Sequence, residues 1–485
     1  MVRLNLKQPL AAQAIQVITV LGCGLRLFHY LRNPSVWHDE AALIVNVLQK
    51  SFFDLLGPLR WNEAGPPLFL WAERAAALIF GDSTYALRLF PLVASCAALV
   101  LFASAARRVL SMTAACWAVV LFAFSDRLLW HACEAKPYST DVLVATGVLF
   151  AFARMRDWPI GRQLLVWGLL SPAMIFASYP ACFLCGALLL YYGPKIVRNE
   201  NCTTMSLYAG FAIAVLVSFL LLYLGPIRAQ RNTAMEECWT LHFPDWSRPW
   251  LFPAWTAMST AEVFRYCFLP FGSVLLPFAI LGAISIWRSE QRAWLILFIG
   301  PLAFAWLAAC VHGYPYGGSR LEIFALPGLA ILIAVGAEIC VAWLRQRWKP
   351  GRAIVYASLL LPAVFAISTI AIPWPRADVA GASSYIQSQS QPDDCIRANH
   401  WEYSYYFRHD SRYGEIVATD EPAAASRVWL AVTTPEAANR EALLHPWLAK
   451  WRVVETRDFT WTTVWLLERQ PETIAPINPS ASGGQ

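Results

Sequence analysis

The stretch SLYAGFAIAVLVSFLLLYLGP, residues 206–226, contains no charged side chain and is long enough to cross a lipid bilayer as one helix. Comparable apolar stretches recur between residues 11 and 373 and stop after Pro373. The 485-residue chain is 58% hydrophobic and 14% charged, which is too apolar for a soluble protein of this length. We therefore expect an all-α protein that crosses the membrane many times.

Hydropathy predicts about eleven membrane helices, with errors of a few residues at each end. Their ranges are 11–31, 86–106, 112–130, 139–155, 162–178, 180–194, 206–226, 267–287, 293–311, 322–344 and 353–373. Basic residues fall in alternate loops, and such loops stay in the cytoplasm. We expect an inner (plasma) membrane protein with a cytoplasmic N-terminus and a periplasmic, extracytoplasmic C-terminal domain. Since the net charge of +6 is explained by these loops, we expect no nucleic-acid partner.

The composition divides the chain into three regions. Residues 1–373 form the predicted transmembrane domain, whose first outer loop, 32–85, contains two segments (51–59 and 66–80) expected to be helices in the membrane interface. Residues 374–470 read as a small soluble α/β domain, with strands at 427–432 and 460–467 and a helix at 435–450. The tail 471–485 is rich in Pro, Ser and Gly and is expected to be disordered.

Two further patterns favour structural interpretations. The twelve cysteines are scattered, and Cys182 and Cys185 lie inside a predicted helix, so we expect no cysteine-bound metal. The outer loop 228–265 is rich in tryptophan, which favours anchoring at the lipid headgroups over sugar stacking or lipid gating.

Candidate chemistry begins at the string PSVWHDEA, residues 34–41, directly after the first predicted helix. It brings Asp39 and Glu40 to the boundary between water and lipid, where carboxylates are costly to keep without a partner such as a metal, another cation or a substrate hydroxyl. The alternative is that Asp39 only caps a helix that begins near Ala41. His38 is a weaker candidate, with a supporting or purely structural role.

Two later strings are expected on the same outer face. EAKPY, residues 134–138, supplies Glu134, Lys136 and Tyr138, and YPYGGSR, residues 314–320, supplies Tyr316 and Arg320. A guanidinium or ammonium group can bind a phosphate, and neighbouring glycines allow a close approach of the backbone. For the two cations the alternative is contact with lipid headgroups.

Together these groups fit one reaction. A hydroxyl or amine acceptor would attack the anomeric carbon of a sugar whose leaving group is a polyprenyl phosphate, and a carboxylate would take the acceptor proton. We assign Asp39 as the general base, and Glu134 or Glu40 to orient the acceptor or hold a cation. Lys136 and Arg320 would contact the donor phosphate.

The ordered series of strings resembles the GT-C superfamily of membrane glycosyltransferases, especially the group of protein O-mannosyltransferases and lipid A aminoarabinose transferases (glycosyltransferase family 39). The resemblance rests on WHDE (37–40), GPPL (65–68), FG (80–81), LRL (87–89), EAKPY (134–138) and RL (320–321).

The resemblance implies a catalytic Asp in the first outer loop, which is Asp39 here. It also implies a polyprenyl-phosphate sugar donor and an extracytoplasmic lipid, glycan or protein acceptor. Many members use a divalent metal cation, for which Asp39 and Glu134 are the candidate ligands.

The main alternative is a transporter or flippase of a lipid-linked sugar. Transport favours polar or broken segments near the bilayer midplane and paired repeats. The predicted helix centres here are almost free of charge, and the carboxylates gather on one face, which favours an enzyme. A binding scaffold is the third interpretation, and it predicts that Asp39 is dispensable.

Overall fold

The structure is a computed structural model that describes residues 8–198, 201–415 and 425–470, so the predicted disordered tail lies outside the described residues. The contacts divide the chain into two compact units. The first, here the helical unit, comprises residues 1–34 and 46–374, and the second, the mixed unit, comprises residues 35–45 and 375–485. The predicted membrane domain included residues 35–45, whereas the contacts group them with the C-terminal residues.

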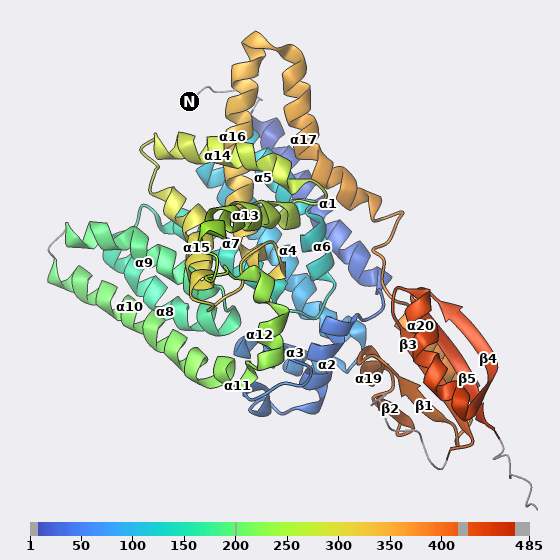
Figure 1. The fold of residues 1–485 in the computed structure, drawn as a ribbon. Coiled ribbons are helices and arrows are strands. Elements are labelled where there is room, and N and C mark those ends of the chain that lie inside the picture. Colours follow the sequence, from blue (N-terminus) through green and yellow to red (C-terminus); the bar gives the residue numbers. More distant parts are fainter. Residues whose placement is uncertain (1–7, 199–200, 416–424, 471–485) are drawn as a thin grey trace, which may run out of the picture. The chain divides into compact units, whose positions relative to one another are not determined.

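The helical unit is a bundle of apolar helices (Figure 1). Six of its helices are long and apolar enough to span a bilayer, or up to eight if two bent pairs each form one span. The membrane character is confirmed, while the count of eleven stays a prediction. The principal helices are α1 (Gln8–Arg32), α4 (Thr84–Val109), α5 (Met112–Ala123), α6 (Asp126–Ala132), α7 (Tyr138–Met155), α8 (Ile160–Ala177), α9 (Ala181–Val197), α10 (Cys202–Leu222), α13 (Phe252–Cys267), α14 (Leu276–Trp287), α15 (Trp294–Cys310), α16 (Leu326–Arg347) and α17 (Lys349–Ser368).

Two predicted helices are broken. The segment predicted at 112–130 bends by 51° between α5 and α6, where Ser125 accepts a bond from the amide of Leu128 and so begins α6. The segment predicted at 267–287 is wrong in its first part: α13 ends at Cys267, and α14 begins at Leu276 after a bend of 105°. Pro270 has no amide hydrogen to donate, so it cannot continue a regular helix through this segment.

A buried arginine stabilises the first of these breaks. Arg26, on α1, is fully buried and donates to the hydroxyl of Ser95 on α4 at 2.8 Å. It also donates to the carbonyl of Ala123 at 2.9 Å, at the C-terminal end of α5. Carbonyls at a helix end have no partner within the helix, so the guanidinium supplies one inside the bundle.

Helices α14 and α16 pack with their backbones almost in contact. A Cβ atom at Gly282 would lie 2.0 Å from the carbonyl oxygen of Leu332, and one at Gly336 would lie 1.8 Å from that of Phe278. Only glycine fits at such distances, and small residues at this spacing are typical of helix contacts in membranes.

The first outer loop contains one of its two predicted interfacial helices. The prediction at 66–80 is confirmed as α3 (Pro67–Phe80). The prediction at 51–59 is wrong, because only a short turn, η1 (Asp54–Leu56), forms there. The carboxylate of Asp54 accepts from the hydroxyl of Ser51 at 2.6 Å, a local bond that favours a turn over a helix. A further helix, α2 (His38–Gln49), precedes this turn.

The mixed unit contains a five-stranded sheet with the strand order β2-β1-β3-β5-β4. Strand β3 pairs in parallel with β1 and antiparallel with β5, and the sheet carries apolar side chains on both faces. The predicted strands at 427–432 and 460–467 and the helix at 435–450 are confirmed. The elements are α18 (Val379–Gln389), β1 (Cys395–Ala398), α19 (Glu402–Tyr406), β2 (Tyr413–Glu415), β3 (Arg427–Thr433), α20 (Ala437–Leu444), β4 (Trp451–Phe459) and β5 (Thr462–Arg469).

Candidate active site

Glu134 lies in the short turn that joins α6 to α7. The turn closes through a backbone bond from the amide of Lys136 to the carbonyl of Glu134 (2.8 Å), and the hydroxyl of Ser139 donates to the carbonyl of His131 (2.8 Å). Pro137 precedes the first residue of α7, Tyr138. These bonds fix the string EAKPY as a rigid turn at the helix ends.

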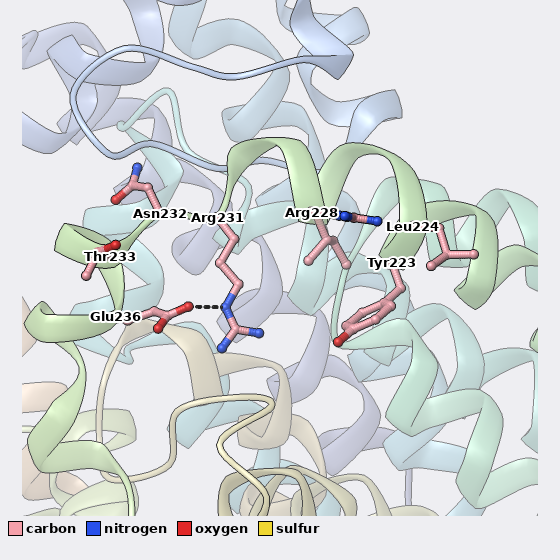
Figure 2. A pocket seen from close by; sticks show the side chains of 8 residues that line it. Tyr223, Leu224, Arg228, Arg231, Asn232, Thr233 and Glu236 are labelled. Atoms are coloured by element: carbon pink, nitrogen blue, oxygen red, sulfur yellow. Dashed lines mark hydrogen bonds and ion pairs between the residues drawn. The ribbon is translucent and has the colours of Figure 1, made fainter.

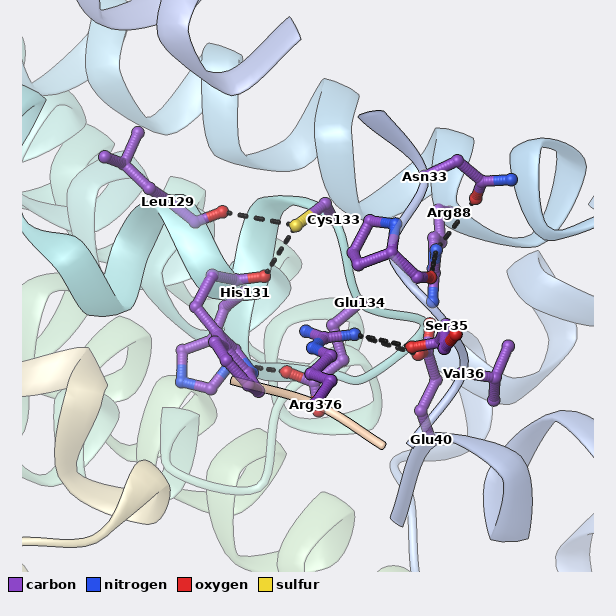
Figure 3. Close-up of polar contacts among 12 residues, drawn as sticks. Asn33, Ser35, Val36, Glu40, Arg88, Leu129, His131, Cys133, Glu134 and Arg376 are labelled. Carbon is purple, nitrogen blue, oxygen red and sulfur yellow. Dashed lines mark hydrogen bonds and ion pairs between the residues drawn. The ribbon is translucent and has the colours of Figure 1, made fainter. Parts of the chain in front are cut away.

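The Glu134 carboxylate is fully buried and engages His131 (Figure 3). The distance from Glu134 Oε2 to His131 Nδ1 is 3.0 Å, and His131 Nε2 lies 3.0 Å from the phenol oxygen of Tyr266 on α13. The guanidinium of Arg127 lies 5.0 Å from the ring centre of the same tyrosine. Glu134 therefore belongs to a buried polar chain that joins α6, the turn and α13.

Lys136 forms an ion pair with Glu63, which sequence reasoning missed. The lysine side chain is 2% exposed and that of Glu63 is 13% exposed, so the pair is largely removed from water. Glu63 comes two residues before the GPPL string, and no pattern around it distinguished it from other acids of the first outer loop.

Arg320 and Tyr138 also lie together. The Arg320 guanidinium carbon is 5.9 Å from the ring centre of Tyr138 and 5.8 Å from that of Trp239, and the ring of Tyr138 is 4.6 Å from that of His131. The helical unit thus brings Glu134, Tyr138 and Arg320 into one cluster around His131, with Lys136 in the same turn.

Tyr316 has a different environment within that unit. Its hydroxyl pairs with Thr260 on α13 at 2.9 Å, and its amide donates to the carbonyl of His242 at 3.0 Å. The ring is 3% exposed and packs against Trp255. These contacts indicate that Tyr316 fixes its loop against α13.

The mixed unit contains the other predicted residues, His38, Asp39 and Glu40. Helix α2 begins at His38, so Asp39 lies inside its first turn, where the positive end of the helix dipole stabilises a carboxylate. The imidazole Nε2 of His38 is 3.3 Å from Asp39 Oδ1. The side chain of Asp39 is 19% exposed, although its oxygen Oδ2 is buried.

Glu40 is buried by contrast. Its carboxylate oxygen Oε2 lies 3.8 Å from Nη1 of Arg376, which also donates to the carbonyl of Ser35 at 3.1 Å (Figure 3). Through this one nitrogen, Arg376 ties the start of the C-terminal residues to Ser35 and to the first turn of α2. Glu40 therefore has a structural partner, and Arg376 is a second residue that sequence reasoning missed.

His400 and Glu402 are further residues of the mixed unit beside His38. The ring centres of His38 and His400 are 5.7 Å apart, and His400 Nδ1 lies 2.7 Å from Glu402 Oε2. Burial lowers the pKa of the His400 imidazole, but the hydrogen bond and negative charge of Glu402 outweigh this, so the pKa is raised above its ordinary value. No sequence pattern pointed to these two residues.

The metal site predicted at Asp39 and Glu134 stays a prediction. Among them, no group of three or more His, Cys, Asp or Glu side chains is arranged to hold a metal ion. Glu134, one of the two predicted ligands, is buried and directs an oxygen at His131.

An open pocket of about 490 Å³ lies in the helical unit at the end of α10. It is lined by Tyr223, Leu224, Ile227, Arg228, Arg231, Asn232, Thr233 and Glu236, and Figure 2 shows Arg231 paired with Glu236. None of the predicted site residues lines it.

No protein-family model matches the sequence, and no curated protein matches it. The fold nevertheless resembles solved structures of membrane glycosyltransferases. ArnT from Cupriavidus metallidurans bound to undecaprenyl phosphate is 13% identical with a TM-score of 0.54, over 93% of this chain and 97% of that one. The same protein in the apo state is 15% identical with a TM-score of 0.53, over 92% and 97%.

A second structural relative comes from Archaeoglobus fulgidus. Its oligosaccharyltransferase in complex with Zn and sulfate is 12% identical with a TM-score of 0.51, over 84% of this chain and 63% of that one. At these identities the similarity concerns the fold. It confirms the predicted fold class, a helical membrane protein with a small C-terminal α/β domain.

Proposed function

We propose that this chain, a multi-pass membrane protein with the GT-C fold, transfers a sugar from a polyprenyl-phosphate donor to an extracytoplasmic lipid, glycan or protein acceptor. The class of donor is supported by the structure of ArnT bound to undecaprenyl phosphate, which matches this chain over nearly its whole length. The orientation of the termini follows the distribution of basic loops.

Asp39 is the proposed general base, and its exposure is the observation that carries the assignment. Of the three candidate carboxylates, Glu40 and Glu134 have fully buried side chains that engage Arg376 and His131, while Asp39 is 19% exposed. A base must reach the proton that it removes. Glu40 and Glu134 therefore suit the role of holding neighbouring groups in place.

The proposed step is a single displacement. An oxygen or nitrogen of the acceptor bonds to the anomeric carbon while Asp39 takes its proton, and the bond from that carbon to the phosphate oxygen breaks. The polyprenyl phosphate departs as an anion, and the sugar inverts its configuration. Lys136 and Arg320 are the proposed partners of the phosphate, where cationic donors stabilise the developing charge.

No step of this mechanism passes through a metal, and among the described residues no group of three or more His, Cys, Asp or Glu side chains is arranged to hold one. Chelation tests that choice: EDTA should leave transfer in washed vesicles unchanged. Loss of transfer with EDTA and recovery with a divalent cation would require a revised mechanism.

The base assignment is tested with Asp39→Asn in membrane vesicles supplied with radiolabelled polyprenyl-phosphate sugars. We expect transfer to fall on the order of a hundred- to ten-thousandfold, the usual contribution of a general base. Asp54→Asn is the matched control, since Asp54 belongs to the same loop and is exposed. Wild-type transfer by Asp39→Asn would reject the base. Comparison of membrane glycolipids and glycans with and without the gene would identify the sugar and the acceptor.

A further inference from the structure

The imidazole of His38 is surrounded by aromatic rings of the mixed unit. Its ring centre lies 4.8 Å from that of Trp37, 5.7 Å from that of His400 and 6.2 Å from that of Trp401. The indole nitrogen of Trp401 also donates to the backbone carbonyl of His38 at 2.5 Å. Both the backbone and the ring of His38 are therefore restrained by residues 400–401, which lie more than 360 positions further along the chain.

His400 is itself held in place. Its Nδ1 atom lies 2.7 Å from Oε2 of Glu402, whose side chain is only 4% exposed. A hydrogen bond from one ring nitrogen to a buried carboxylate fixes the orientation of an imidazole and decides which nitrogen carries the proton. Glu402 lies in the first turn of α19, so its position is set by that helix.

These contacts form a continuous series from the sheet-bearing part of the mixed unit to the proposed base. Glu402 binds His400, the ring of His400 packs beside that of His38, and His38 Nε2 lies 3.3 Å from Asp39 Oδ1. Side chains that hold a catalytic group have measurable effects, because a displacement of about 1 Å can cost a hundredfold in rate.

We propose that His400 and Glu402 are positioning residues for the transfer reaction: they fix the ring of His38, which in turn orients the carboxylate of Asp39. This rests on the proposed function of Asp39. It gives the C-terminal domain, which had no assigned role, a part in catalysis as well as in folding.

The raised pKa of His400 agrees with this arrangement, because it shows that the bond to Glu402 favours the protonated ring. A charged His400 donates from both nitrogens, so it is restrained on one side by Glu402 and presents a second donor on the other.

The test is a double-mutant cycle in full-length protein in vesicles. His400→Ala should lower kcat about ten- to a hundredfold with little change in KM, since positioning affects the reacting group more than substrate binding. In an Asp39→Asn background the same change should have no further effect, because the residue that it positions is already lost. His445→Ala is the matched control, since His445 is exposed and belongs to the same domain.

Variants of similar shape separate positioning from folding. Glu402→Gln keeps the size of the side chain but removes its charge, and it should lower kcat while the melting temperature of the full-length protein stays within a few degrees of wild type. His400→Gln retains a donor to Glu402 and should recover part of the activity lost in His400→Ala.

Three results have distinct meanings. Equal losses from His400→Ala in wild-type and Asp39→Asn backgrounds would overturn the positioning role. Wild-type kcat in both His400→Ala and Glu402→Gln, with Asp39→Asn inactive, would also overturn it but leave the proposed function intact. Full activity of Asp39→Asn would reject the base itself.

Discussion

Replacing Arg26 with alanine should destabilise the helical unit by a predictable amount. The guanidinium makes two short bonds between helices, to the hydroxyl of Ser95 and to the carbonyl of Ala123, and a longer one of 3.5 Å to the carbonyl of Phe122. Such bonds in membranes contribute about 0.6–1.7 kcal/mol each. A buried carbonyl left without a donor costs about 1–3 kcal/mol more. Removing the guanidinium also removes the cost of burying its charge, which offsets part of these losses. We therefore expect the free energy of unfolding to fall by about 2–4 kcal/mol.

The assay is the fraction of folded protein as SDS is added to mixed micelles, followed by tryptophan fluorescence. Arg108→Ala is the control, because Arg108 is exposed and its hydrogen bond goes to the carbonyl of Ser104 on its own helix, although its guanidinium also lies 5.3 Å from the ring centre of Phe150. Arg26→Lys retains the charge without the planar fork and should fall between wild type and Arg26→Ala. If Arg26→Ala and Arg108→Ala unfolded at the same SDS concentration, the Arg26 guanidinium would not stabilise the break between α5 and α6.

Other perturbations give equally direct outcomes. Gly336→Ala should separate α14 from α16 and lower the SDS concentration at which half of the protein is unfolded. Gly210→Ala is the control and should leave this midpoint unchanged, because no atom lies within 4 Å of the new Cβ. Equal midpoints for the two variants would contradict the close contact between α14 and α16. Glu63→Gln leaves the buried Lys136 ammonium without this charge partner and should cost about 3–5 kcal/mol; the double variant Glu63→Met with Lys136→Met should regain most of that stability but not sugar transfer. The His400–Glu402 pair should stabilise the protein fully below pH about 6.5 and lose this effect as pH rises through the raised pKa of His400. The difference in melting temperature between wild type and Glu402→Gln should therefore decrease as the pH rises. An increase in this difference would contradict a raised pKa of His400.

The sequence allowed much of the helical fold to be predicted, because bilayer-length apolar segments are a strong signal. It could not reveal the break after Cys267. The residues that follow, FLPFG, are as apolar as a membrane helix, and only the loss of helical bonding at Pro270 distinguishes them. The five-stranded sheet was predicted in part, since β3 and β5 are continuous apolar runs while β4 is largely exposed and polar.

The candidate site, too, could be predicted from the sequence only in part. Motif strings pointed to His38, Asp39, Glu134 and Arg320, each of which lies in a short, distinctive segment. Glu63, Arg376 and His400, which contact the predicted residues Lys136, Glu40 and His38, come from segments without any such pattern. A partner is chosen by proximity in the fold, and a single sequence carries no record of which distant side chains meet.

The grouping of residues 35–45 with the C-terminal residues has a consequence for biosynthesis. The amide of Val36 donates to the phenol of Tyr406, and the two positions are 370 residues apart. A nascent chain therefore contains the segment with Asp39 among its earliest parts, while the residues that pack on this segment leave the ribosome among the last. A product released before residue 376 would retain every apolar helix yet lack the partner of Glu40. Completion of translation thus acts as a checkpoint for this segment, and prematurely terminated chains would be inserted but immature.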